Sequence, residues 1–123
     1  KKEAKRQKET YGLMALSGKY RIKNKKEIDR VFKSGRTVKG SFLFIRFADS
    51  SRAHSRFALI VPSKYVPLAV DRNKIKRTLS EEIVRIPGLL GKNCDVVVSV
   101  SRKITRSEFK NLSKELRELT SGI

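Results

Sequence analysis

The chain has very few of the side chains that most often carry enzyme chemistry. Its 123 residues include one cysteine, one histidine and no tryptophan. A single cysteine excludes an internal disulfide, which suits a reducing compartment, and we expect the protein to be cytoplasmic. One cysteine and one histidine cannot form an ordinary zinc site. They are also a poor nucleophilic pair, because His54 lies in a polar turn and Cys94 just before a predicted buried strand.

Acidic residues are scarce as well. Twelve Asp and Glu stand against 30 Lys and Arg, which gives a formal net charge of +18. The acidic residues do not show the D-x-D pattern of a two-metal nuclease, and the chain has no Gly-rich phosphate-binding loop. We therefore expect neither catalytic residues nor a metal site in the protein itself.

Long apolar runs are also missing. The longest, residues 57–61, is followed by Pro62 and is far shorter than the roughly 18 residues of a membrane-spanning helix. Residues 1–8 are basic, but no apolar stretch of signal-peptide length follows them. Because the first ten residues have no apolar side chain larger than Ala4, we expect residues 1–18 to form a flexible basic tail. Residues 19–123 are expected to form one folded domain.

The excess of positive charge indicates a polyanionic partner. Binding to anionic lipid would call for one amphipathic helix with a basic face. Here the cations occur throughout the chain, with nine in residues 19–39 against two acidic residues. Cations on several successive segments are typical of a nucleic-acid-binding surface. The alternative is that many are lysines exposed for solubility, which needs a net charge of only about 2 to 8.

The apolar pattern predicts strands that alternate with helices, as in a small α/β sandwich. Residues 41–48 (SFLFIRFA) and 56–61 are rich in aromatic and β-branched side chains and are predicted strands. Residues 95–101 (DVVVSVS) are typical of a buried central strand. Alternation divides the large side chains of the first strand between two faces: Leu43, Ile45 and Phe47 on one, and Phe42, Phe44 and Arg46 on the other.

Three helices are expected. The first covers residues 25–33, with Asn24 as its N-cap and Gly35 as a left-handed residue at its end. The second begins near Val70 or Asp71 and ends at Pro87-Gly88. The third follows residues 105–108, which have the form of a capping box. Their apolar residues repeat at helical spacing: Ile28, Val31 and Phe32; Ile75, Leu79, Ile83 and Ile86; and Phe109, Leu112, Leu116 and Leu119.

The densest polar group lies at the start of the second helix, in residues 70–77 (VDRNKIKR). Ile75 faces the core, so Asn73 and Arg77 project together on another side of the helix. Cations and an amide at a helix N-terminus suit RNA phosphates, base edges and sugar hydroxyls. The alternative is an ordinary helix with a solvated basic face. The candidate RNA-binding residues are Arg72, Asn73, Lys74, Lys76 and Arg77.

Three blocks of sequence resemble the protein subunit of bacterial ribonuclease P. Residues 56–61, Lys64 and residues 71–77 (DRNKIKR) are similar to that family's strand, lysine-bearing loop and R-N-R-x-K-R core. Residues 20–22 and 28–36 (IDRVFKSGR) look like its R-L…F-x-x-V-F-x-x-G element, and residues 95–98 with Arg102 and Lys103 like its last strand and exit. The resemblance runs from about residue 19 to residue 119.

This resemblance implies a single-domain αβββαβα two-layer sandwich with a mixed sheet of about four strands and a left-handed crossover. It also implies that residues 19–123 bind RNA as a non-catalytic protein cofactor. Its partners would be the catalytic RNA subunit and the 5′ leader of precursor tRNA, which the holoenzyme removes by Mg²⁺-dependent hydrolysis. No membrane or small-molecule partner is implied.

The resemblance assigns roles to several residues. Arg72, Asn73, Lys76 and Arg77 fall on the motif helix that faces the RNA subunit, and Lys74 replaces the second arginine, losing its planar fork. For the leader, the family has a cleft between the first helix and the sheet, and plain core packing is the alternative for its aromatic residues. The candidate cleft residues are Ile28 (where the family often has an aromatic), Phe32, Phe44, Arg46 and the loop lysine Lys64.

Two other functions stay open at this point. A ribosomal-protein-like RNA-binding module explains the charge and the α/β pattern, but it does not explain the spacing of the three blocks. A stand-alone nuclease would need a general acid and base, and the chain offers few candidates for either.

Overall fold

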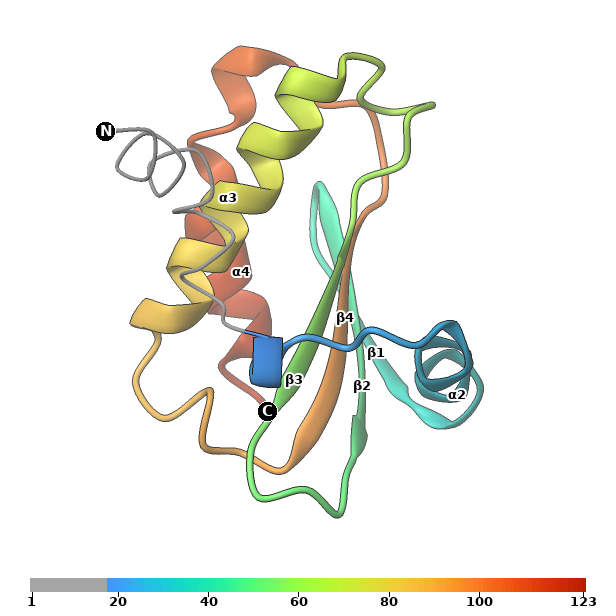
Figure 1. The fold of residues 1–123 in the computed structure, drawn as a ribbon. Coiled ribbons are helices and arrows are strands. Elements are labelled where there is room, and N and C mark those ends of the chain that lie inside the picture. Colours follow the sequence, from blue (N-terminus) through green and yellow to red (C-terminus); the bar gives the residue numbers. More distant parts are fainter. Residues whose placement is uncertain (1–17) are drawn as a thin grey trace, which may run out of the picture.

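The computed structural model describes residues 18–123 (Figure 1). The tail expected over residues 1–18 therefore lies outside the described residues, apart from Gly18. Within the described range, no helix is both long and apolar enough to cross a membrane. The elements follow in the order η1 (Gly18–Tyr20), α2 (Lys25–Ser34), β1 (Arg36–Lys39), β2 (Leu43–Asp49), β3 (Arg56–Ile60), α3 (Ala69–Arg85), β4 (Cys94–Val100), η2 (Arg106–Glu108) and α4 (Asn111–Thr120).

The four strands form one mixed sheet in the order β1-β2-β4-β3. The β1–β2 and β2–β4 pairs are antiparallel, and β3 and β4 are parallel because α3 connects them as a crossover. Helices α3 and α4 lie side by side on one face of the sheet, and α2 lies on the other (Figure 1). The αβββαβα order and the four-stranded mixed sheet are confirmed. Helix α2 adds a short layer to the two expected, and the handedness of the crossover stays a prediction.

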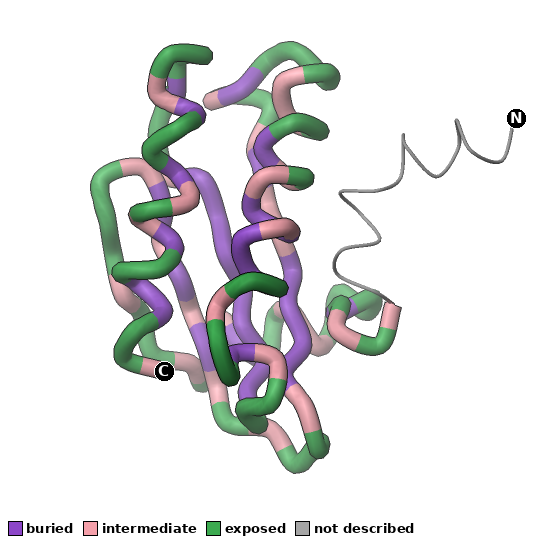
Figure 2. Tube along the Cα trace, turned by 90° about the vertical axis from the view of Figure 1, so that its left-hand side faces the viewer, coloured by how far each residue is buried: buried purple, intermediate pink, exposed green. Residues whose placement is uncertain are grey.

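The position of β4 explains its continuous apolar sequence. All seven of its residues are buried, because it lies between β2 and β3 and has helices over both faces (Figure 2). The main core lies between the sheet and α3–α4, and includes Ile45, Phe57, Ile75 and Leu116. A smaller cluster under α2 consists of Ile22, Val31, Ala58 and Val97.

Helix α2 begins as predicted, but its end differs from the expectation. Asn24 is the N-cap, and its side chain accepts a hydrogen bond from Lys26 N–H (2.8 Å). Gly35 is extended (φ −84°), so the predicted left-handed residue is wrong. Glycine is required there by close packing instead, since a Cβ would lie 2.4 Å from the Val31 carbonyl oxygen and 2.9 Å from that of Phe47.

The remaining helices agree with their apolar patterns. Helix α3 buries Ile75, Leu79 and Ile83, while Ile86 caps its end and is partly buried. Helix α4 buries Leu112, Leu116 and Leu119, and Phe109 is buried just before it. The capping box opens the short η2 helix rather than α4, with the Glu108 carboxylate accepting from Thr105 N–H (2.9 Å).

Ion pairs attach α2 to the sheet. Asp95 of β4 is fully buried and accepts hydrogen bonds from Arg56 Nε (3.1 Å), Arg56 Nη2 (3.0 Å) and Arg30 Nη2 (2.9 Å). Arg56 also donates from Nη1 to Glu27 in α2 (2.9 Å). This hydrogen bond lowers the pKa of Glu27 below its ordinary value of 4.5. Asp95 and Arg56 thus connect β4 and β3 to Glu27 and Arg30 in the N-terminal part of α2.

Candidate nucleic-acid interface

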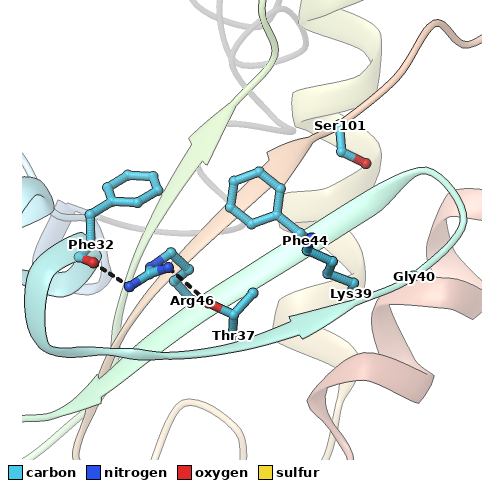
Figure 3. Close-up of a pocket in the computed structure, with 7 residues that line it drawn as sticks. All are labelled: Phe32, Thr37, Lys39, Gly40, Phe44, Arg46 and Ser101. Atoms are coloured by element: carbon cyan, nitrogen blue, oxygen red, sulfur yellow. Dashed lines mark hydrogen bonds between the residues drawn. The ribbon is translucent and has the colours of Figure 1, made fainter.

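An open cleft of about 630 Å³ lies between the C-terminal half of α2 and the β1–β2 hairpin (Figure 3). Its position follows from the alternation of β2, which turns Leu43, Ile45 and Phe47 into the core and leaves Phe44 and Arg46 half-buried on the α2 side. The lining residues are Phe32, Thr37, Lys39, Gly40, Phe44, Arg46 and Ser101.

Two aromatic rings form the apolar part of this cleft. Phe32 from α2 and Phe44 from β2 approach edge to face, with centroids 6.3 Å apart and an interplanar angle of 68°. Both are only partly buried, so each ring packs on the protein and also has surface open to the cleft. Such rings offer a stacking surface for unpaired bases.

Arg46 lines the cleft but directs most of its guanidinium to the protein. Nη1 donates to Thr37 Oγ1 (2.9 Å), and Nη2 donates to the carbonyl oxygens of Phe32 and Gly35, the second at 3.3 Å. These carbonyls belong to the C-terminal end of α2, where a cation is favoured by the helix dipole. Nε is buried and has no hydrogen-bond partner within residues 18–123. Arg46 therefore holds α2 against the hairpin and leaves one donor unused.

Two of the predicted cleft residues lie elsewhere. Ile28 borders a separate hollow of about 270 Å³ at the β3 edge of the sheet, together with Arg21 and with Lys76 of the motif helix. Lys64 is exposed in the loop after β3, with Nζ 4.9 Å from the centre of the Tyr65 ring. The structure therefore brings together Phe32, Phe44 and Arg46, but neither Ile28 nor Lys64 lines the same cleft.

The motif helix presents its polar residues as the helical spacing predicts. Ile75 is fully buried, whereas Asn73, Lys74 and Arg77 are exposed in the first turns of α3. Arg72 differs from Arg77, because its Nη1 donates to the carbonyl oxygens of Val66 (2.9 Å) and Pro67 (2.8 Å). Arg72 thus fixes the loop that leads into α3.

Four cleft residues were not predicted from the sequence: Thr37, Lys39, Gly40 and Ser101. Thr37 and Lys39 belong to β1, a four-residue edge strand whose pattern is mostly polar and exposed. Lys39 lies in the basic run over residues 19–39, which was the only signal for it. Ser101 enters the cleft because β2 pairs with β4, a long-range contact that no local pattern indicates.

The lone cysteine and histidine occupy different surroundings. His54 Nε2 lies 2.8 Å from the Lys19 carbonyl oxygen, and its ring packs edge-on against Tyr20. Cys94 is buried at the start of β4, where burial raises the pKa of its thiol. The structure gives them no shared partner that would support nucleophilic catalysis.

These features define a small basic α+β protein with an aromatic cleft on one face of its sheet and an exposed basic helix on the other. The family model for ribonuclease P matches residues 16–123. The ribonuclease P protein component of Syntrophomonas wolfei is 31% identical over 100 residues, which covers 81% of this chain and 83% of the relative.

Solved structures of the same class have a similar fold. The ribonuclease P protein from Thermotoga maritima superposes with a TM-score of 0.73 at 26% identity, covering 84% of this chain and 96% of that one. The protein from Staphylococcus aureus gives a TM-score of 0.70 at 26% identity, covering 81% of this chain and 91% of that one. The chain belongs to the ribonuclease P protein family. Membership implies a part in tRNA processing alongside an RNA subunit.

Proposed function

We propose that this chain is the protein cofactor of a ribonuclease P holoenzyme, in which RNA is the catalyst. It would bind the RNA subunit through the motif helix and the 5′ leader of precursor tRNA through the cleft. The observation that carries this proposal is the arrangement of the two candidate surfaces. The Phe32–Phe44 cleft lies on the α2 side of the sheet and α3 lies on the opposite side, so two RNA segments can bind together.

The chemistry of the cleft suits a single strand. Phe32 and Phe44 offer ring surface for bases, and stacking on an aromatic side chain is worth roughly 1 to 3 kcal/mol per base. Lys39, which lines the cleft and is exposed, supplies a cation for the backbone. These contacts favour unpaired bases, which a leader has and a folded tRNA body mostly lacks.

The chemistry of the motif helix suits structured RNA. Asn73, Lys74 and Arg77 are exposed on adjacent turns, so they can follow a phosphate backbone while Asn73 reads a sugar hydroxyl or base edge. Binding of this kind releases counterions and becomes weaker as salt is raised. The cations of the protein would also reduce the electrostatic repulsion between the phosphates of the RNA subunit and those of precursor tRNA.

We propose that the magnesium required by the holoenzyme is held by RNA. Within residues 18–123, the His, Cys, Asp and Glu side chains do not gather into a group of three that would bind a metal ion. No step is therefore assigned to a protein-bound magnesium ion, and the contribution of the chain is to hold the substrate and the RNA subunit together.

Reconstitution tests the proposal directly. The chain is combined with a bacterial ribonuclease P RNA, and cleavage of a precursor tRNA is measured over a range of magnesium concentrations. We expect the protein to raise the cleavage rate and to lower the magnesium concentration required, because it supplies part of the charge compensation. No change in either quantity would exclude a cofactor role. Cleavage by the protein freed of RNA would show instead that the chain is itself a nuclease.

A further inference from the structure

The β1–β2 hairpin ends in a turn that does not complete its own backbone hydrogen bonds. Gly40 N–H donates to the Leu43 carbonyl oxygen (2.8 Å). In an antiparallel pair of this kind, Leu43 N–H would donate back to Gly40. Here it donates to Oε2 of Glu115 in α4 (2.7 Å), and the same oxygen accepts from Phe42 N–H (2.9 Å). A carboxylate from a distant helix therefore replaces the backbone acceptor of the turn.

Glycine at position 40 allows this close approach. A Cβ at that position would lie 2.3 Å from Glu115 Oε2 and 2.7 Å from its Cδ. The backbone of Gly40 has no positive φ, so the left-handed region is not the reason for a glycine. A side chain at position 40 would therefore have to displace the Glu115 carboxylate.

The same turn is also held by the segment after β4. The Phe42 carbonyl oxygen accepts from Ser101 N–H (2.8 Å) and from Ser101 Oγ (3.1 Å). Ser101 lines the cleft, and so do Lys39, Gly40 and Phe44 of the hairpin (Figure 3). The hydrogen bonds to Glu115 and Ser101 consequently set where this wall of the cleft stands relative to Phe32 on α2.

We propose that Glu115 is a positioning residue for single-stranded RNA in the cleft. Its carboxylate does not line the cleft and would act only through the hairpin, by keeping Lys39 and Phe44 in place before RNA binds. A wall that is already ordered costs less conformational entropy to use in binding. The proposal rests on the proposed function, in which the 5′ leader occupies this cleft.

The test uses the holoenzyme reconstituted with ribonuclease P RNA. The affinity for precursor tRNA is divided by the affinity for mature tRNA, which isolates the contribution of the leader. We expect Glu115→Ala to reduce this ratio roughly tenfold, about the effect of one lost charge-assisted hydrogen bond. Glu115→Gln, which keeps an acceptor oxygen, should stay within about threefold of the wild type. In hydrogen exchange, the Phe42 and Leu43 amides should exchange faster in Glu115→Ala than in Glu115→Gln or the wild type.

Matched control variants distinguish the proposed positioning effect of Glu115 from a general effect of removing negative charge and from a loss of folding. Glu118→Ala removes an exposed glutamate from the same helix and should leave the ratio unchanged. Gly40→Ala should reproduce the loss with Glu115 intact, whereas Gly122→Ala, whose Cβ would meet nothing within 4 Å, should not. The Gly40 pair decides the question if Glu115→Ala fails to fold. A similar loss in Glu118→Ala, or an unchanged ratio in Gly40→Ala, would overturn the positioning role.

Phe32→Ala distinguishes the two levels of the proposal. If it lowers the ratio while Glu115→Ala and Gly40→Ala do not, the leader occupies the cleft but Glu115 does not position it. If Phe32→Ala also leaves the ratio unchanged, the leader does not use the cleft, and the proposed function fails at this surface.

Discussion

The arginines on the two sides of the sheet are used in different ways. On the α2 side, Arg30, Arg46 and Arg56 all donate to acceptors within the protein. On the motif helix, Arg77 is exposed and forms no ion pair with any residue in the range 18–123. Only Arg72 at the start of that helix is turned back, toward the Val66 and Pro67 carbonyls.

This difference shows that net charge alone says little about which cations are available to RNA. A guanidinium that caps a helix or neutralises a buried carboxylate is already paired, and moving it to a phosphate would break those bonds. In the cleft, Arg46 is therefore committed to the protein, and the aromatic rings and Lys39 are left to contact RNA. The motif helix is a surface whose cations are free to contact phosphates.

The largest effect is expected from the buried carboxylate that anchors α2. Asp95→Asn should lower the free energy of unfolding by about 3 kcal/mol, because Arg56, which is 7% exposed, loses its buried charged partner and keeps only Glu27. Chemical denaturation measures this loss. The exposed Asp29→Asn on α2 makes the same charge change and should have little effect. Equal stabilities for the two variants would show that the ion pairs are not what holds α2.

The helices and strands of this fold could be predicted from the sequence wherever neighbouring residues in the chain determine them. Asn24 at the start of α2, the stripe of Ile75, Leu79 and Ile83, and the β-branched run of β4 all depend on near neighbours in the chain. Strand β1 could not be predicted from its own residues, because this exposed edge strand of four residues has no alternation of apolar and polar side chains. Its existence followed only from the resemblance.

The candidate site could be predicted in part, because local spacing determines some of its residues and long-range packing the others. Helical spacing places Asn73 and Arg77 on an exposed surface, and strand alternation places Phe44 and Arg46 on one face. The partners of Arg46 and Arg72, by contrast, are carbonyl oxygens whose positions depend on how whole elements pack. Gly35 illustrates the same limit in part, because its glycine is required by the nearby carbonyl oxygens of Val31 and of Phe47, which lies in β2, and not by its own backbone angle.

A matched pair of alanine variants tests the comparison itself. Arg46→Ala should lower the free energy of unfolding by about 1.5 kcal/mol through its lost hydrogen bonds, with the salt dependence of RNA-subunit binding unchanged. Arg77→Ala should leave stability within about 0.5 kcal/mol. It should also reduce the log–log slope of affinity against salt by roughly 0.7 to 0.9 for the lost phosphate contact. If Arg46→Ala reduced the salt dependence and Arg77→Ala reduced the stability, Arg46 would be the RNA contact and Arg77 the structural residue.

The smallest effect is expected from Glu27, at the solvent-facing end of the α2 anchor. Its pKa is lowered chiefly by the hydrogen bond from Arg56, with further help from the charges of Arg56 and Arg52, while desolvation and, less strongly, the charge of Asp95 oppose the shift. A group whose pKa is lower in the folded state stabilises the protein above its unfolded pKa, here near 4.5, and loses that contribution as the pH falls through the folded value. The stability advantage of the wild type over Glu27→Gln should therefore be constant at neutral pH and shrink below pH 4.5.

Glu108, whose pKa is also lowered, is common to both proteins, so the difference between their unfolding free energies isolates Glu27. A difference that stays constant in acid would mean that the Arg56–Glu27 contact contributes nothing to holding α2, leaving Asp95 as its charged anchor.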